Sequence, residues 1–162
     1  MKYTNVSRFD SYRTYLKQYA PNLKRIAFPA STTIVSQNFF NFPDLEYIDS
    51  SLCDNCTQFC VTACPKLEEA HIPPLVDGFY GMFLSCSAMK DVFVYGSPNL
   101  SATSLYAFDN TPVFNMWVND SEYSNWTTYL NNVGKSNKVV LKRFSEYTGN
   151  NLIQKWVTPS EP

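Results

Sequence analysis

The chain has 162 residues, which is long enough for one domain with a hydrophobic core that needs no metal or disulfide support. Its formal net charge is -1, and only 17% of its residues are charged, against about 25% in an average globular domain. A nucleic-acid-binding chain is expected to carry a clustered basic surface, so this charge balance argues against a nucleic-acid partner.

The sequence also predicts that the chain does not span a membrane, because it contains no run of about 18 apolar residues. No apolar stretch follows the N-terminal residues Met1 to Asn5, so no signal peptide is recognised. We therefore expect a cytoplasmic or virion location if the chain is a complete gene product. A cell-surface or secreted location is expected if it is a trimmed mature form.

Residues 1–20 are predicted to form an N-terminal helical cap. Ser7 resembles a helix N-cap, with the acidic Asp10 three residues later. Four large apolar or aromatic residues follow at spacings of three and four, which places them on one face of a helix: Phe9, Tyr12, Leu16 and Tyr19. We expect this helix to cover residues 7–19.

Residues 21–118 contain an internal repeat. Gapless segments begin at Pro21, Pro43, Pro65 and Ser87, one every 22 residues. Apolar residues recur in the same columns, namely Leu23, Leu45, Leu67 and Met89, then Ile26, Ile48, Ala70 and Val92, then Phe39, Val61 and Phe83. A single unit of this length cannot bury its own apolar face, whereas stacked units bury a continuous core.

Each unit opens with the pattern L-x-x-I-x-I. Its last two apolar positions alternate, as a strand with one buried face requires. The second half of the unit has wider apolar spacing, which indicates a helical turn or irregular structure on the opposite side. Pro29 and Pro73 lie just past the strand positions and end them. The repeat therefore predicts a parallel sheet that gains one short strand per unit.

The segment FYGMFLSCSAMKDVFVYG, from Phe79 to Gly96, resembles the unit of the BspA-like leucine-rich repeat family. Cys64 and Cys86 occupy the cysteine position of that family, and Tyr106-Ala107-Phe108 reproduces its Ala-Phe step. The resemblance extends from Pro21 to Val133. It implies an α/β repeat solenoid, a leucine-rich-repeat-like right-handed stack with a short parallel sheet on one face and helical caps at both ends.

The chain departs from the family pattern at two places. Asp49 and Ser50 stand where apolar or Pro residues are usual. The spacing of 24 residues from Val94 to Val118 is longer than the repeat.

Residues 119–162 are predicted to be a C-terminal helical cap and tail. Tyr123, Trp126 and Leu130 form an apolar stripe at helical spacing. Beyond Lys138 the tail holds the short apolar run Val139-Val140-Leu141 and an amphipathic segment through Trp156. We expect this tail either to pack as an additional cap or to reach a partner.

The five cysteines (Cys53, Cys56, Cys60, Cys64 and Cys86) allow two interpretations. The C-x2-C spacing of the first two is that of a zinc half-site. However, no second such pair or His pair follows, and Cys64 is explained by its repeat column. We expect small buried thiols and no metal. Neighbouring strands lie about 4.8 Å apart, so Cys64 and Cys86 come within disulfide reach, but we expect them to stay free because such thiols are usually free in this family.

Strand alternation places a strip of acidic and aromatic side chains on the outer face of the sheet: Tyr47, Asp49, Glu69, His71, Asp91, Phe93 and Trp117. Arg25, Ala27 and Asn115 share these columns. Aromatic anchors beside acids suit a protein or carbohydrate ligand. The alternative is an ordinary solvated face.

Three functions compete. The family resemblance implies a non-catalytic binding module of the adhesion type, with a protein or glycan ligand. A structural subunit of a larger assembly, such as a bacteriophage virion, is the alternative, and its surface would contact neighbouring subunits. An enzyme would need a pocket around Asp49, Glu69 and His71. Because no phosphate-binding loop, nucleophile elbow or zinc-protease motif occurs, we predict no catalysis and no cofactor.

Overall fold

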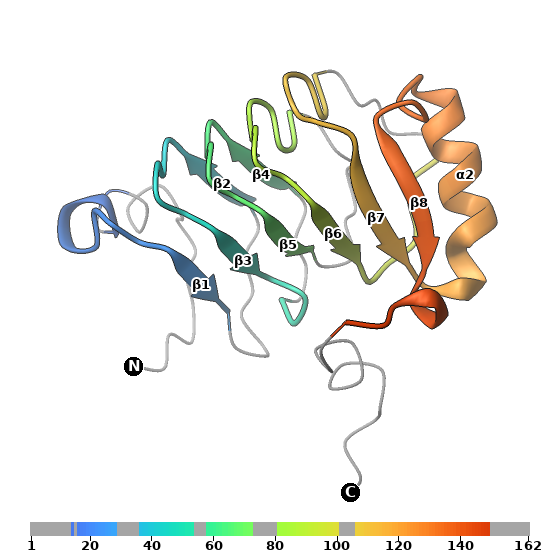
Figure 1. Ribbon diagram of the computed structural model, residues 1–162, viewed down its shortest axis with the longest axis horizontal. Helices are drawn as coiled ribbons and strands as arrows, with labels where there is room; N and C mark the ends of the chain where they lie inside the picture. Colours follow the sequence, from blue (N-terminus) through green and yellow to red (C-terminus); the bar gives the residue numbers. More distant parts are fainter. Residues whose placement is uncertain are drawn as a thin grey trace, which may run out of the picture.

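The protein has an α/β fold whose main element is a six-stranded sheet of parallel strands (Figure 1). The computed structural model describes Thr14 and residues 16–28, 36–53, 58–72, 81–100 and 106–149. Within these ranges the main sheet contains β1 (Arg25–Ala27), β3 (Tyr47–Asp49), β5 (Glu69–Ile72), β6 (Asp91–Val94), β7 (Phe114–Val118) and β8 (Val139–Arg143), adjacent in that order. A second sheet pairs β2 (Ser36–Phe40) with β4 (Gln58–Thr62), and these two strands are also parallel.

The strand register follows the sequence repeat. Arg25 lies opposite Tyr47, Tyr47 opposite Glu69, and Glu69 opposite Asp91, so each residue pairs with the one 22 positions later. Between β6 and β7 the partners are Asp91 and Asn115, which carries the longer spacing expected before Val118. The columns aligned in the sequence are therefore the columns that hydrogen bonding brings side by side.

The core lies between the inner face of the main sheet and the segments that return behind it. Ile48, Ala70, Val92 and Met116 line that inner face, and all four are buried. Opposite them lie Phe39, Val61, Phe83 and Phe108, in the same hydrophobic cluster. Complete burial of one such large side chain stabilises the fold by roughly 1.5–3 kcal/mol. The apolar columns predicted from the sequence are thus the two walls of one core.

The chain turns behind the sheet through residues with a left-handed backbone. Asn41, Ala63 and Ser85 stand 22 residues apart and have φ values of 57°, 53° and 59°. This conformation is costly for a residue with a side chain. Each backbone N–H donates a hydrogen bond to the neighbouring unit, to the carbonyl oxygens of Thr62, Leu84 and Asp109, respectively. The repeated contact between units helps to offset the cost.

The C-terminal end of the sheet is covered by α2 (Tyr123–Asn132), which lies beside β8 in Figure 1. Trp126 and Leu130 are buried, as the apolar stripe predicts, and Tyr123 packs against the core. The indole Nε1 of Trp126 donates to the carbonyl of Gly96 at 2.9 Å. A short 3-10 turn, η1 (Asp120–Glu122), joins β7 to this helix.

At the N-terminal end, Thr14 and residues 16–19 are helical, within the range predicted for the first cap. Leu16 is buried, but Tyr19 is 65% exposed, so the prediction that both residues belong to one buried face is wrong. The chain leaves the helix at Ala20, and Tyr19 therefore sits at its last turn rather than along its packed side. Phe9 and Tyr12 lie outside the described residues.

The sheet extends beyond the repeat segment predicted to end at residue 118. β8 pairs with β7 from Phe114 opposite Val139 to Val118 opposite Arg143. The Val139-Val140-Leu141 run, interpreted from sequence as tail, is therefore the sixth strand. The intervening helix separates β8 from the repeat, so no constant spacing marked it as a further strand.

Three thiols, those of Cys53, Cys64 and Cys86, are free and buried. The Cys64 Sγ lies 3.9 Å from the Phe39 carbonyl oxygen, and the Cys86 Sγ lies 3.6 Å from that of Val61. A hydrogen bond with the Cys86 thiol lowers the pKa of Cys64. No group of three metal-binding side chains occurs among the described residues, which exclude Cys56.

None of the helices in the described ranges has the length and apolar character needed to cross a membrane.

Candidate functional site

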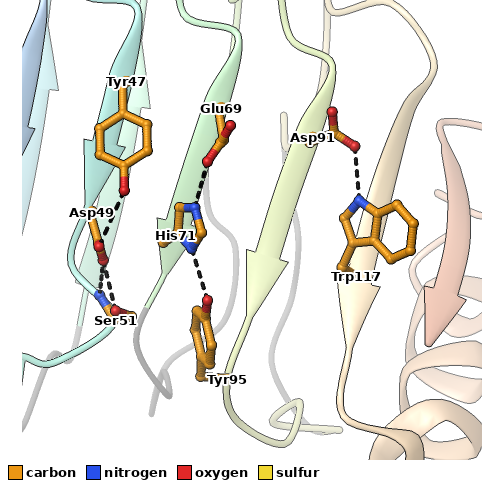
Figure 2. A network of polar contacts seen from close by, with 8 residues as sticks. All are labelled: Tyr47, Asp49, Ser51, Glu69, His71, Asp91, Tyr95 and Trp117. Carbon is orange, nitrogen blue, oxygen red and sulfur yellow. Dashed lines mark hydrogen bonds and ion pairs between the residues drawn. The ribbon is translucent and has the colours of Figure 1, made fainter. Parts of the chain in front are cut away.

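The seven side chains predicted to form the outer strip do share one face of the main sheet (Figure 2). Glu69 and Asp91 lie in register with Tyr47 in one row, and the next row contains Asp49, His71, Phe93 and Trp117. We call these seven residues the outer strip. Their alignment follows from the strand register, because residues that alternate along paired strands point to the same side.

The rings of the outer strip stack across the strands. His71 and Phe93 have ring centroids 4.4 Å apart and planes within 11°. Phe93 and Trp117 are 6.1 Å apart and within 10°. Parallel strands hold equivalent residues one strand spacing apart, about 4.8 Å, which suits stacked planar rings.

A cation from the chain lies at each end of this stack. The guanidinium of Arg25 is 4.0 Å from the centroid of the Tyr47 ring, and the Lys142 ammonium is 4.8 Å from that of Trp117. Such contacts contribute about 0.5–2 kcal/mol according to how well they exclude water. They also show that the ring faces of the strip accept positive groups.

His71 lies at the centre of the strip and is fully buried. Its Nε2 is 2.7 Å from the Glu69 Oε1, and its Nδ1 is 2.8 Å from the Tyr95 hydroxyl (Figure 2). Both ring nitrogens therefore have hydrogen-bond partners, as a buried imidazole requires. These contacts hold the ring in its stacked orientation.

The Tyr95 hydroxyl is not poised for chemistry. Burial, followed by the negative charge of Asp49, raises its pKa far above the usual value for a phenol. The phenol therefore keeps its proton at neutral pH and acts as a hydrogen-bonding group. A Tyr-His-Glu arrangement in which Tyr95 serves as nucleophile or base is disfavoured by this electrostatic setting.

Asp49 does not join the His71–Glu69 pair. Its Oδ1 accepts hydrogen bonds from the Ser51 backbone N–H at 3.0 Å and from the Ser51 hydroxyl at 2.7 Å. Its Oδ2 accepts a hydrogen bond from the Tyr47 hydroxyl at 3.3 Å. The structure thus separates the three residues considered for a catalytic group, bringing two of them together and engaging the third elsewhere.

Asp91 positions the last ring of the strip. Its Oδ1 accepts a hydrogen bond from the Trp117 indole Nε1 at 2.8 Å and another from the Asn115 amide at 3.0 Å. Both donors lie on β7, the neighbouring strand. The carboxylate therefore fixes the Trp117 ring against Phe93.

The outer strip is covered rather than solvated. Phe144, from the 3-10 turn η2 (Phe144–Glu146), is buried in a second cluster with Phe93 and Trp117. The edge of the Tyr147 ring meets both Phe93 and Trp117, with centroid distances of 5.2 and 4.9 Å. Phe93 is only 1% exposed, so the alternative of an ordinary solvated face is wrong. The Glu69 side chain remains 30% exposed, and Asp91 is half-buried.

We call residues 144–149 the strap, because they follow β8 and lie over the strip. The backbone N–H and hydroxyl of Ser145 both donate to the Asp120 carboxylate, whose pKa these hydrogen bonds lower. The Arg143 backbone N–H donates to the Glu146 Oε2 at 3.2 Å, which closes the turn. The strap is thus held by exposed polar contacts on one side and buried rings on the other.

Tyr95, Phe144 and Tyr147 are site residues that sequence reasoning missed. Tyr95 continues the alternation of β6 two positions beyond Phe93, so the strand pattern carried a usable signal. The two aromatic residues of the strap follow a strand that lay outside the repeat. No spacing rule connected them to residues about fifty positions earlier.

No protein-family model matches the chain, and comparison with the curated proteins and with the solved structures found no match.

Proposed function

We propose that this chain is a non-catalytic interaction module built as a leucine-rich-repeat-like solenoid of the BspA-like type. The 22-residue register of β1, β3, β5 and β6 supports the repeat interpretation, because every unit adds one strand in the same orientation. The outer strip of this solenoid binds a protein or glycan, with the residues named for it in the sequence as the binding residues.

The observation that carries this proposal is the composition of the strip together with its acidic rim. Glu69 and Asp91 each use one carboxylate oxygen in hydrogen bonds to neighbours. Among the described residues, no hydrogen bond engages their other oxygens. Aromatic rings beside carboxylates that retain hydrogen-bonding capacity give a partner both apolar contact area and directional anchors.

The absence of catalysis is part of the same proposal. The Glu69–His71 pair is committed to Tyr95 and to the ring stack, and the pKa of Tyr95 favours its protonated form. A general base needs both access to substrate and a change of protonation state. His71 has no exposed surface, so substrate cannot reach its ring nitrogens.

The test is to screen the full-length protein against a displayed peptide library and a glycan array. Each binder is then measured on Glu69→Gln, on Asp91→Asn and on Glu68→Gln. Glu68 is the matched control, since it is an adjacent exposed glutamate paired with Lys90 outside the strip. We expect roughly tenfold weaker binding, about 1.4 kcal/mol, for the two strip variants and no change for the control. Binders that ignore both strip variants would rule out the strip as the binding surface.

A second candidate is a subunit of a larger assembly such as a virion. The observation that favours it is the closure of the strip, since rings buried against the strap are not open to a freely diffusing ligand. Fractionation of the native source separates the two ideas. A binder is expected at the cell surface or in the medium, and an assembly subunit is expected in purified particles at a fixed stoichiometry.

A further inference from the structure

We infer that the strap is an internal substitute for a partner and that the outer strip binds an extended segment of another protein. That segment carries two aromatic side chains separated by two residues. This inference rests on the proposed binding function and specifies the partner.

The strap already shows what the strip accommodates. Tyr147 presents the edge of its ring to the faces of Phe93 and Trp117, the arrangement that aromatic pairs prefer. Three residues earlier, Phe144 packs against Tyr95, with centroids 5.3 Å apart. One short segment with two rings therefore covers the side of the strip formed by β6 and β7.

The rim selects the chemistry of the second ring. Burial, then the negative charges of Glu69 and Asp91, raise the pKa of Tyr147, so its hydroxyl stays protonated. A phenol next to two carboxylates can donate a hydrogen bond, whereas an acidic group in that place would be repelled. A neutral tyrosine side chain is therefore the partner residue that this position fits best.

The strap is held less firmly than the strand before it. β8 is paired along its whole length with β7, whereas the polar contacts of the strap to Asp120 are exposed. Hydrogen bonds of this kind stabilise by about 0.5–1.5 kcal/mol each and exchange with water at little cost. An incoming segment with equivalent rings can thus replace the strap without unpairing the sheet.

Gly149 provides a way to move Tyr147 without deleting any ring. A Cβ at position 149 would lie 2.4 Å from the Tyr147 hydroxyl oxygen and 2.5 Å from its Cζ. These atoms are the far end of a flexible side chain, so the ring rather than the backbone is expected to shift. A single methyl group at residue 149 is therefore expected to displace Tyr147 from Phe93 and Trp117.

The experiment measures binding of a fluorescein-labelled peptide with the sequence of residues 143–149, RFSEYTG, to the full-length protein by fluorescence anisotropy. We compare wild type with Gly149→Ala and Tyr147→Ala, using Thr148→Ala as the matched control because Thr148 is exposed. We expect both strap variants to bind the peptide roughly tenfold more tightly than wild type. The control should resemble wild type, and the peptide RASEATG should not bind.

Three results would overturn the inference. The first is equal peptide affinity for wild type and for both strap variants, provided that their thermal unfolding shows them to be folded. The second is binding of an oligosaccharide, with cellohexaose as the probe, in place of the peptide. The third is dimerisation of Gly149→Ala by size-exclusion light scattering, which would make a second copy the occupant. If library binders still depend on Glu69 and Asp91 while the peptide fails, the binding function stands and this partner chemistry is wrong.

Discussion

Replacement of Phe93 by alanine is expected to be among the most destabilising single changes in the outer strip. The side chain is 1% exposed and stacks between His71 and Trp117, with the edge of Tyr147 against its face. Truncation of a buried phenylalanine costs about 3–5 kcal/mol, through lost transfer energy and an incompletely filled cavity. The stacking contacts place Phe93→Ala in the upper part of that range.

Urea denaturation followed by far-ultraviolet circular dichroism measures this free energy of unfolding. Phe93→Leu retains most of the volume and separates burial from ring stacking, with an expected loss below about 1.5 kcal/mol. Val113→Ala is the surface control, because Val113 is 59% exposed and its truncation should change stability by less than about 0.5 kcal/mol. A loss below about 1 kcal/mol for Phe93→Ala would refute the conclusion that the strip is a second packed cluster.

Three further predictions concern individual contacts. Ser145→Ala is expected to raise the pKa of Asp120, because the two groups of Ser145 lower it in the native protein; the stability from this contact is present above the unfolded pKa and is lost as pH falls through the folded value, which carboxyl NMR titration measures. Burial raises the pKa of Tyr95, so its phenol should resist ionisation well above pH 10; the folded protein loses stability as pH rises past the unfolded value, and Tyr95→Phe should remove one late-titrating phenol from the absorbance at 295 nm. The buried free thiols should react with Ellman's reagent only after denaturation, and rapid native labelling of any of them would contradict their burial: Cys53, Cys64 and Cys86.

The success of the sequence interpretation at the sheet has a simple origin. The pairing of Tyr47 with Glu69 and of His71 with Phe93 follows directly from a gapless 22-residue repeat. Equal unit length forces equivalent residues into register, and alternation then assigns each to the inner or outer face. The same reasoning predicted the buried positions Trp126 and Leu130 from helical spacing.

The candidate site was predicted in its membership but not in its environment. Alternation could place His71 and Phe93 on the outer face, but it carried no information on what lies above them. Glu69 and Tyr95 bind opposite nitrogens of His71, and only the positions of three strands in space bring those groups together. The prediction of a solvated or open strip failed because burial depends on distant parts of the chain.

Local periodicity by itself determined the strand positions, their register and the face on which each side chain lies. Tertiary structure decided that Val139–Arg143 closes the sheet and that Phe144 and Tyr147 cover the outer strip. The reason is physical: register depends on spacing within the chain, which the sequence contains. Burial of a face depends on which remote segment packs there, and that choice is made by the free energy of the whole fold.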